Sequence, residues 1–290
     1  MNPVAKLAGF AAVLVLAFGG AAFAGSRIDV RPGKQSAEQP EAHGMGAADA
    51  EREGGHGGDG AVPEAVRGLA VSEGGLTLEL TRTTATAGKR SYVAFRIVDR
   101  GGQTVRDFDV EHTKRMHVIV VRRDMTGFQH VHPTQRVAGT WSVPVTLRKP
   151  GSYRVFADFS VAGKAYTVAD DLTVDGTVRS QQLSAPVDSV NVDGMRVSLT
   201  EGASDAGGKA ELGFEVTRDG EPVAIEDYLG AKGHLVALRQ GDLAFLHVHP
   251  DENALKFMAT FPTAGNYRLF LQFQTDGRVH TAAFTQEVVR

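Results

Sequence analysis

The sequence predicts an all-β protein: two tandem β-sandwich domains that follow an N-terminal hydrophobic helix and a disordered linker. Three observations support this prediction. Beyond residue 62 the chain consists of short segments rich in β-branched and aromatic residues, such as HVIVVR and YRVFADF, separated by clusters of Gly, Pro, Asp or Thr. No segment of that region keeps a helical period with caps. The region also consists of two similar halves.

The first 25 residues have the pattern of an export signal. Lys6 is their only charged residue, and an apolar run follows it from Leu7 to Gly25. The small-x-small sequence at residues 22–24 suits cleavage by a signal peptidase, whereas the apolar run also approaches the roughly 20 residues that span a bilayer. We therefore expect residues 1–25 to be either a signal peptide or a membrane anchor. In both cases we expect the remainder of the chain to lie outside the cytoplasm, either secreted or anchored to the cell membrane by residues 7–25.

Residues 26–62 are expected to form a disordered linker rich in histidine and glycine. From Pro32 onward they include eight glycines but no Leu, Ile, Phe, Trp or Tyr, so they cannot bury enough apolar surface to fold. His43, Met45 and His56 lie in this linker. Imidazole and thioether groups are ligands that copper accepts, but these residues also fit a solvated linker in which they are incidental.

A duplicated domain accounts for the rest of the chain. FRIVDRGGQTV, MHVIVVRRDMTGFQHVHP and PGSYRVFADF in the first half recur as FEVTRDGEPV, GHLVALRQGDLAFLHVHP and AGNYRLFLQF in the second. Their histidines repeat at a spacing of 117 residues and their Gly-x-Tyr-Arg segments at a spacing of 114 residues, which indicates a duplication. About 110 residues with seven or eight short strands fit a β-sandwich. We expect these domains at residues 63–178 and 184–290.

Composition narrows the function. The chain has 290 residues, a net charge of −3 and no cysteine. Without a basic excess, nucleic-acid binding is not expected, and without cysteine there is no disulfide, thiolate zinc site or cysteine nucleophile. The sequence also lacks a phosphate-binding loop, a nucleophile elbow and an HExxH motif. We therefore expect a protein that is not an enzyme.

Six histidines form the motif His-x12-His-x-His-Pro, which occurs once in each half: His117, His130 and His132, and again His234, His247 and His249. Histidines two residues apart on a strand point to the same face. In the second copy, Gly241-Asp242 suits a two-residue hairpin turn. A turn there would place His234 opposite His249, with His247 diagonal to His234. The same register would place His117 opposite His132, so three imidazoles should converge on one face of each hairpin.

Three converging imidazoles suit a Cu(II) or Zn(II) ion with a fourth position for water, a carboxylate or a partner. We therefore predict an exported protein that binds copper or zinc, with these six histidines as the metal ligands. The alternative is a non-catalytic interaction module of the cell envelope, whose partner is another envelope protein. In that case the histidines are structural groups that hold the hairpins.

The segments HVIVVRRDMTGFQHVHP, GTWSVPVTLRKPGSYRVFADF and GHLVALRQGDLAFLHVHP resemble those of an essentially uncharacterised family of exported actinobacterial proteins. Members have an N-terminal hydrophobic segment, a His/Gly-rich spacer and two such domains. The resemblance implies export and the tandem architecture, and the family is sometimes labelled heavy-metal-binding. A looser similarity connects the chain to periplasmic copper carriers, which are small β-sandwiches with His and Met ligands. This chain departs from them because it has no N-terminal histidine ligand and no Met-rich loop.

The segments KPGSYRVF and TAGNYRLF resemble the entry to a late strand of immunoglobulin-like sandwiches. In such sandwiches a tyrosine hydroxyl donates a hydrogen bond back to the backbone of the corner. The resemblance therefore implies two immunoglobulin-like domains in which Tyr153 and Tyr267 are structural.

Overall fold

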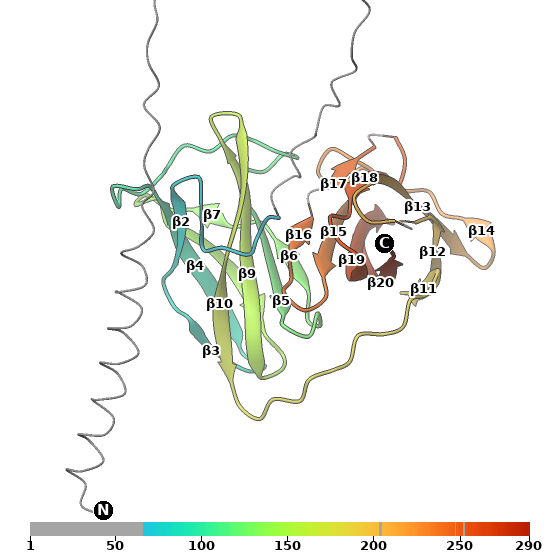
Figure 1. The fold of residues 1–290 in the computed structure, drawn as a ribbon, viewed down its shortest axis with the longest axis horizontal. Helices are drawn as coiled ribbons and strands as arrows, with labels where there is room; N and C mark the ends of the chain where they lie inside the picture. The colour runs from blue at the N-terminus through green and yellow to red at the C-terminus, as the bar shows by residue number, and fades with distance from the viewer. Residues whose placement is uncertain (1–65, 203–204, 247, 252) are drawn as a thin grey trace, which may run out of the picture. The chain divides into compact units, whose positions relative to one another are not determined.

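The computed structural model describes residues 66–202, 205–246, 248–251 and 253–290. These residues form twenty β-strands and no α-helix, so none of them belongs to a helix that could span a membrane. The strands build two β-sandwiches in chain order (Figure 1), which confirms the predicted all-β fold with two tandem domains. The expected signal or anchor at residues 1–25 and the expected linker at residues 26–62 lie outside the described residues.

The first sandwich consists of two five-stranded sheets. One sheet has the order β1-β2-β4-β8-β7, with strands at Ser72–Glu73, Leu76–Leu80, Arg90–Val98, Trp141–Thr146 and Thr134–Gln135. The other has the order β3-β10-β9-β5-β6, with strands at Thr84–Thr86, Lys164–Asp175, Gly151–Val161, His117–Arg122 and Gln129–Val131. Buried and more exposed residues alternate along β8, so one of its faces packs into the core between the sheets.

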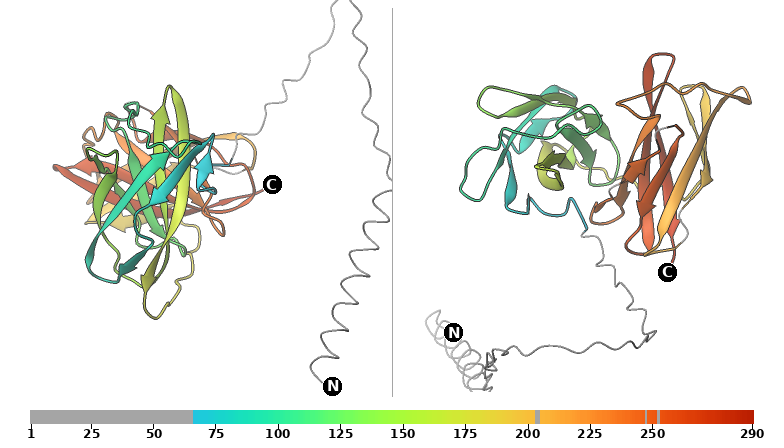
Figure 2. Two further views of the ribbon diagram at one scale, coloured as in Figure 1. Left: turned by 90° about the vertical axis from the view of Figure 1, so that its left-hand side faces the viewer. Right: turned by 90° about the horizontal axis from the view of Figure 1, so that it is seen from above.

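The second sandwich repeats this plan. One sheet has the order β11-β12-β13-β18-β17, with strands at Ser189–Val192, Met195–Glu201, Lys209–Arg218, Lys256–Thr260 and Val248–Pro250, and β14 at Glu221–Pro222 pairs with β13. The other has the order β16-β15-β19-β20, with strands at Phe245–Leu246, Gly233–Arg239, Gly265–Thr275 and Arg278–Val288. The right-hand view of Figure 2 shows the strands of this domain as two facing layers.

Topology and a pair of tyrosines make the sandwiches immunoglobulin-like. In the first domain β2 pairs antiparallel with β4. The short strand β3, which lies between them in the chain, belongs to the opposite sheet and pairs parallel with β10. The Tyr153 hydroxyl donates to the carbonyl of Lys149 at 2.9 Å, and the Tyr267 hydroxyl donates to the carbonyl of Thr263 at 2.8 Å. Both tyrosines are buried. The predicted structural role of the two tyrosines is confirmed.

Replacing Tyr267 by phenylalanine would remove this hydroxyl and keep the ring, which packs edge-on against Phe261. Because the Thr263 carbonyl then loses its donor, we expect the free energy of unfolding to fall by about 1–2 kcal/mol. Urea denaturation measures the loss. Tyr92→Phe is the control, since Tyr92 is 58% exposed and a surface change of this kind should stay within about 0.5 kcal/mol. An unchanged midpoint in Tyr267→Phe would show that the corner bond contributes nothing.

An apolar interface joins the two sandwiches. It is formed mainly by β5 and β9 of the first domain and β15 and β19 of the second, with the buried residues Ile119, Val121, Met125, Phe156, Ala169, Val236, Leu238, Leu243, Phe245 and Phe270. The rings of Phe128 and Phe270 stack with their centroids 4.1 Å apart. Strand β5 is therefore buried along its whole length, with one face in its own core and the other against the second domain. This explains why its sequence is apolar on both faces.

The segment that precedes β1 also contacts both domains. Arg67 forms a β-bridge with Phe245 of the second domain, and the N–H of Gly68 donates to the carbonyl of Thr167 in the first at 3.0 Å. Gly68 has a φ of 70°, and a Cβ atom there would lie 2.7 Å from the ring of Phe156 and 2.9 Å from Cβ of Phe245. Glycine therefore allows the backbone to pass between the two phenylalanines.

Candidate metal centre

The first histidine hairpin has the register that the sequence predicts. Val118 pairs with Val131 and Ile119 with His130, so His132 follows opposite His117. His117 begins β5, and His130 lies within β6. Single nitrogen atoms of His117, His130 and His132 all lie within 4.8 Å of one another, which confirms that the three imidazoles converge.

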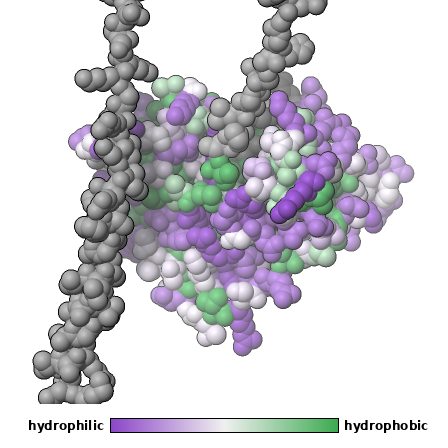
Figure 3. Space-filling model, in the orientation of Figure 1, coloured by the Kyte–Doolittle hydropathy of each residue, from purple (hydrophilic) through white to green (hydrophobic). Residues whose placement is uncertain are grey.

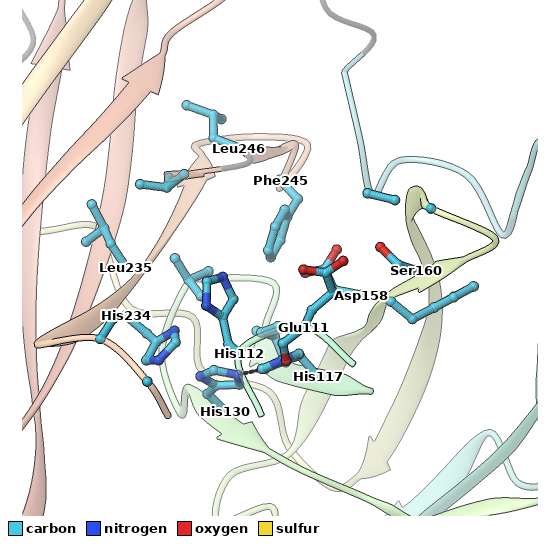
Figure 4. A pocket seen from close by; sticks show the side chains of 18 residues that line it. Glu111, His112, His117, His130, Asp158, Ser160, His234, Leu235, Phe245 and Leu246 are labelled. Carbon is cyan, nitrogen blue, oxygen red and sulfur yellow. Dashed lines mark hydrogen bonds between the residues drawn. The ribbon is translucent and has the colours of Figure 1, made fainter. Parts of the chain in front are cut away.

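The spacing of these three rings matches that of ligands around one ion. The ring centroids are 5.3 Å apart for His117 and His130, and 4.9 Å apart for His132 with each of the others. Bonds of about 2.0–2.1 Å in a tetrahedral zinc site place two imidazole centroids roughly 5 Å apart. Nδ1 of His117 lies 3.1 Å from Nε2 of His130, a contact drawn as a dashed line in Figure 4. Two nitrogens bound to one ion are separated by about this distance.

Hydrogen bonds determine which nitrogens of this pair carry protons. Nε2 of His117 lies 3.1 Å from the carbonyl oxygen of Glu111, and Nδ1 of His130 lies 2.7 Å from Oε1 of Gln272. Both oxygens can only accept, so each of these nitrogens carries the proton of its neutral ring and donates. Nδ1 of His117 and Nε2 of His130 then face each other as two lone pairs. A metal ion between them would accept both, while the outward N–H groups orient the rings.

One other proton arrangement would satisfy the pair without an ion. If the side-chain amide of Gln272 were turned over, its nitrogen would donate to His130, His130 would donate to His117, and His117 would donate to the Glu111 carbonyl. In the structure the amide nitrogen of Gln272 donates to the hydroxyl of Thr281 at 3.3 Å, and its oxygen faces His130. An experimental determination of this amide's orientation would therefore distinguish a metal site from a closed hydrogen-bond network.

His132 supplies a third available nitrogen. Its Nε2 is buried and has no hydrogen-bond partner within the part of the chain that the structure describes. Leaving a buried polar atom unsatisfied costs about 1–3 kcal/mol. A bound ion would satisfy this nitrogen together with the two lone pairs of His117 and His130.

Burial keeps these imidazoles neutral. It lowers the pKa of His117, lowers the pKa of His130 well below 6.5, and lowers the pKa of His132 and of His234 to about 4. Neighbouring histidines lower each of these pKa values further, because two charged rings would repel. Neutral imidazole is the form that binds metal ions.

The second hairpin keeps its predicted register but not its predicted turn. Ala237 pairs with Leu246, and Leu238 pairs with Phe245. The N–H of Arg239 donates to the carbonyl of Ala244, so the loop spans residues 240–243 rather than two residues. This longer loop is still centred on Gly241-Asp242, so the register is unchanged.

The prediction that His249 lies opposite His234 is wrong. His249 pairs with Met258 of β18 in the opposite sheet. The stretch between HVHP and the Gly-x-Tyr-Arg segment is three residues shorter in the second copy. The chain therefore crosses to the opposite sheet by Val248, whereas its counterpart Val131 still pairs with β5. His247 lies outside the described residues.

His234 instead joins the first triplet across the domain interface. Its ring centroid lies 6.2 Å from that of His130 and 6.5 Å from that of His117. His112 lies beside it, with centroids 5.1 Å apart. The sequence does not select His112, because its counterpart is Leu229. It gives no signal for Gln272 either, since only docking of the domains brings that residue to His130.

A pocket of about 450 Å³ between the domains is lined by His112, His117, His130 and His234 (Figure 4). The first domain contributes imidazoles and the carboxylates of Glu111 and Asp158, and the second contributes His234. Leu235, Phe245 and other apolar residues complete the wall. The pocket thus combines several neutral nitrogen ligands with nearby acidic groups that would offset the charge of a cation.

Fold and site together define a two-domain immunoglobulin-like protein with a histidine cluster between its domains. The profile of the family described as "Domain of unknown function (DUF8832)" matches residues 70–176 and again residues 190–290. The chain belongs to this family, and each sandwich is one copy of its domain. No curated protein sequence matches the chain.

Several solved structures show weak likeness. The adhesin FdeC of Escherichia coli is 15% identical with a TM-score of 0.27, and the match covers 76% of this chain and 66% of that one. A tetra-tandem repeat from the extending region of a large adhesion protein is 12% identical with a TM-score of 0.26, covering 74% and 49%. The fibronectin(III)-like modules of Clostridium thermocellum CbhA are 11% identical with a TM-score of 0.21, covering 73% and 93%. Likeness at these TM-scores carries no weight for function.

Proposed function

We propose that the protein is a non-catalytic module of the cell envelope that binds a copper or zinc ion at its histidine cluster through His117, His130 and His132. The observation that carries the metal is the 3.1 Å separation of Nδ1 of His117 and Nε2 of His130, whose other ring nitrogens each lie within hydrogen-bond distance of an oxygen. Three nitrogen ligands suit both ions, and the affinity order of divalent ions favours copper over zinc.

The envelope location rests on the export signal expected in residues 1–25. The face in Figure 3 is mainly hydrophilic, and its apolar residues form small separate groups. Ligating chemistry is concentrated instead in the pocket between the domains.

The domain interface favours a second candidate, an interaction module with structural histidines. His130 of the first domain contacts Gln272 of the second at 2.7 Å, so the cluster already joins the domains without an ion. With the Gln272 amide turned over, every nitrogen of His117 and His130 would be satisfied. This candidate predicts that histidine substitutions lower the melting temperature of the metal-free protein and that no metal binds.

Equilibrium dialysis of the full chain against Zn(II), and separately against Cu(II), tests the metal proposal. We expect the His130→Ala/His132→Ala variant to lose one bound ion per chain, with affinity at that site lowered at least about 100-fold. A lost ligand should cost no less than a lost outer-shell partner, which typically costs 10–100-fold.

The control is His280→Gln, because His280 is buried and bonded to Asp193 but does not line the pocket. The wild type and both variants retain His43 and His56, so any metal bound by these two histidines is the same in all three proteins. Equal binding by the wild type and the double variant would contradict the proposed site. A wild type that binds no ion, with a double variant of lower melting temperature, would support the structural candidate.

A further inference from the structure

The two domains present equivalent histidines to the pocket in the same way. His117 and His234 are counterparts in the duplication. Nε2 of each donates to the carbonyl six residues earlier, which belongs to Glu111 at 3.1 Å and to Tyr228 at 2.9 Å. The proton therefore lies on Nε2 in both neutral rings, and Nδ1 of both carries an available lone pair.

We infer that an ion held by the first-domain triplet takes its fourth ligand from His234 of the second domain. The inference rests on the proposed metal site. The ring centroid of His234 lies 6.2 Å from that of His130, compared with 5.3 Å between His117 and His130. A change of side-chain torsion within one rotamer well moves an imidazole by about this difference. Four nitrogen ligands would then complete a tetrahedral site that the triplet alone leaves open.

The nearest alternatives fit the fourth position less well. Oδ1 of Asp158 already accepts a hydrogen bond from the Thr167 hydroxyl at 2.7 Å, so this bond leaves only Oδ2 of the carboxylate uncommitted. The ring of His112 lies 5.1 Å from that of His234 but 6.3 Å from that of His117, so it borders the fourth ligand rather than the ion.

His234 and Gln272, which are paired in the second domain, would both act at the ion, His234 as a ligand and Gln272 by orienting the ligand His130. His234 pairs with Gln272 in the β15–β19 ladder, and residues paired in this way present their side chains to the same face. Oε1 of Gln272 accepts a hydrogen bond from Nδ1 of His130 at 2.7 Å and so orients that ring. With His234 as a ligand, the ion has bonds to both domains and closes the interface that Phe128 and Phe270 form beside it. Zinc binding and domain docking then strengthen each other.

X-ray absorption at the zinc edge tests the inference on the full chain, with His43→Ala and His56→Ala so that only the pocket is loaded. We expect four imidazole ligands in this protein and three when His234→Ala is added. The affinity for zinc should fall at least about tenfold in that variant, whereas His280→Gln should leave it unchanged. Zinc should also slow amide hydrogen exchange in β15 of the parent protein but not of the His234→Ala variant.

Three imidazoles in both proteins, with equal affinity, would overturn the inference and leave the three-histidine site intact. A loss of affinity in Asp158→Asn with none in His234→Ala would assign the fourth position to the carboxylate and would also overturn it. Absence of zinc from the parent protein, with no Cu(II) bound in dialysis either, would overturn the proposed function itself, so the two failures are distinguishable.

Discussion

Lowering the pH from about 7.5 to about 4.5 should remove several kcal/mol from the free energy of unfolding of the metal-free protein. Burial lowers the pKa of His132 and of His234 to about 4, so the unfolded chain takes up protons near pH 6.5 that the folded chain does not. Stability is therefore complete above about pH 6.5 and falls as the pH drops toward 4. His234, which is 8% exposed, contributes roughly 3 kcal/mol of this loss. His132 is less buried and contributes less.

Charged groups around the cluster modify this dependence without changing its sign. The acidic residues Glu111 and Asp158 oppose the lowering of the pKa of His117. His112 reinforces the lowering at His117 and His234, and Lys114 reinforces it at His132. Burial remains the largest cause at each of these histidines.

Urea denaturation with a chelator present, at several pH values in this range, measures the effect. A His132→Asn/His234→Asn variant should show a distinctly flatter dependence, because its two amides do not titrate. If the wild type had the same free energy of unfolding at both ends of the range, the histidines would not be buried as neutral rings.

Replacing Phe156 by alanine should lower the free energy of unfolding by about 3–5 kcal/mol. Phe156 is 0% exposed, and its ring centroid lies 5.6 Å from that of Phe245 in the second domain. The cavity would open at the interface, where the backbone of Gly68 already lies against the same ring. Trp141, the one tryptophan of the chain, reports unfolding of the first domain.

The same substitution should also affect the second domain. We expect faster amide hydrogen exchange in β15, because Val236 and Leu238 pack in the same cluster as Phe156. Tyr92→Ala is the control, since that side chain is 58% exposed. A loss confined to the first domain, with β15 unchanged, would show that the two sandwiches unfold independently.

The sequence predicts the features that depend on local chemistry. The position of the turn residues predicts the pairing register of β5 with β6 and of β15 with β16. Both registers are as predicted, even though Gly241-Asp242 belongs to a four-residue loop. The roles of Tyr153 and Tyr267 follow from the segments around them. Each depends on contacts between residues close along the chain or on adjacent strands.

The final composition of the cluster depends on contacts that no local pattern encodes. His234 lies with the histidines of the other domain because β5 and β15 face each other across the interface. His249 pairs in the opposite sheet because a connection is three residues shorter. Gln272 and His112 gain their positions only when the domains dock.

Anomalous diffraction at the zinc edge, from crystals of the full chain grown with zinc, would show directly whether the histidine cluster holds an ion. We expect one peak bonded to Nδ1 of His117, Nε2 of His130 and Nε2 of His132 at about 2.0–2.1 Å, with the oxygen of Gln272 still toward His130. An empty cluster in zinc-containing crystals, with the Gln272 amide nitrogen donating to His130, would contradict this expectation and establish a closed hydrogen-bond network.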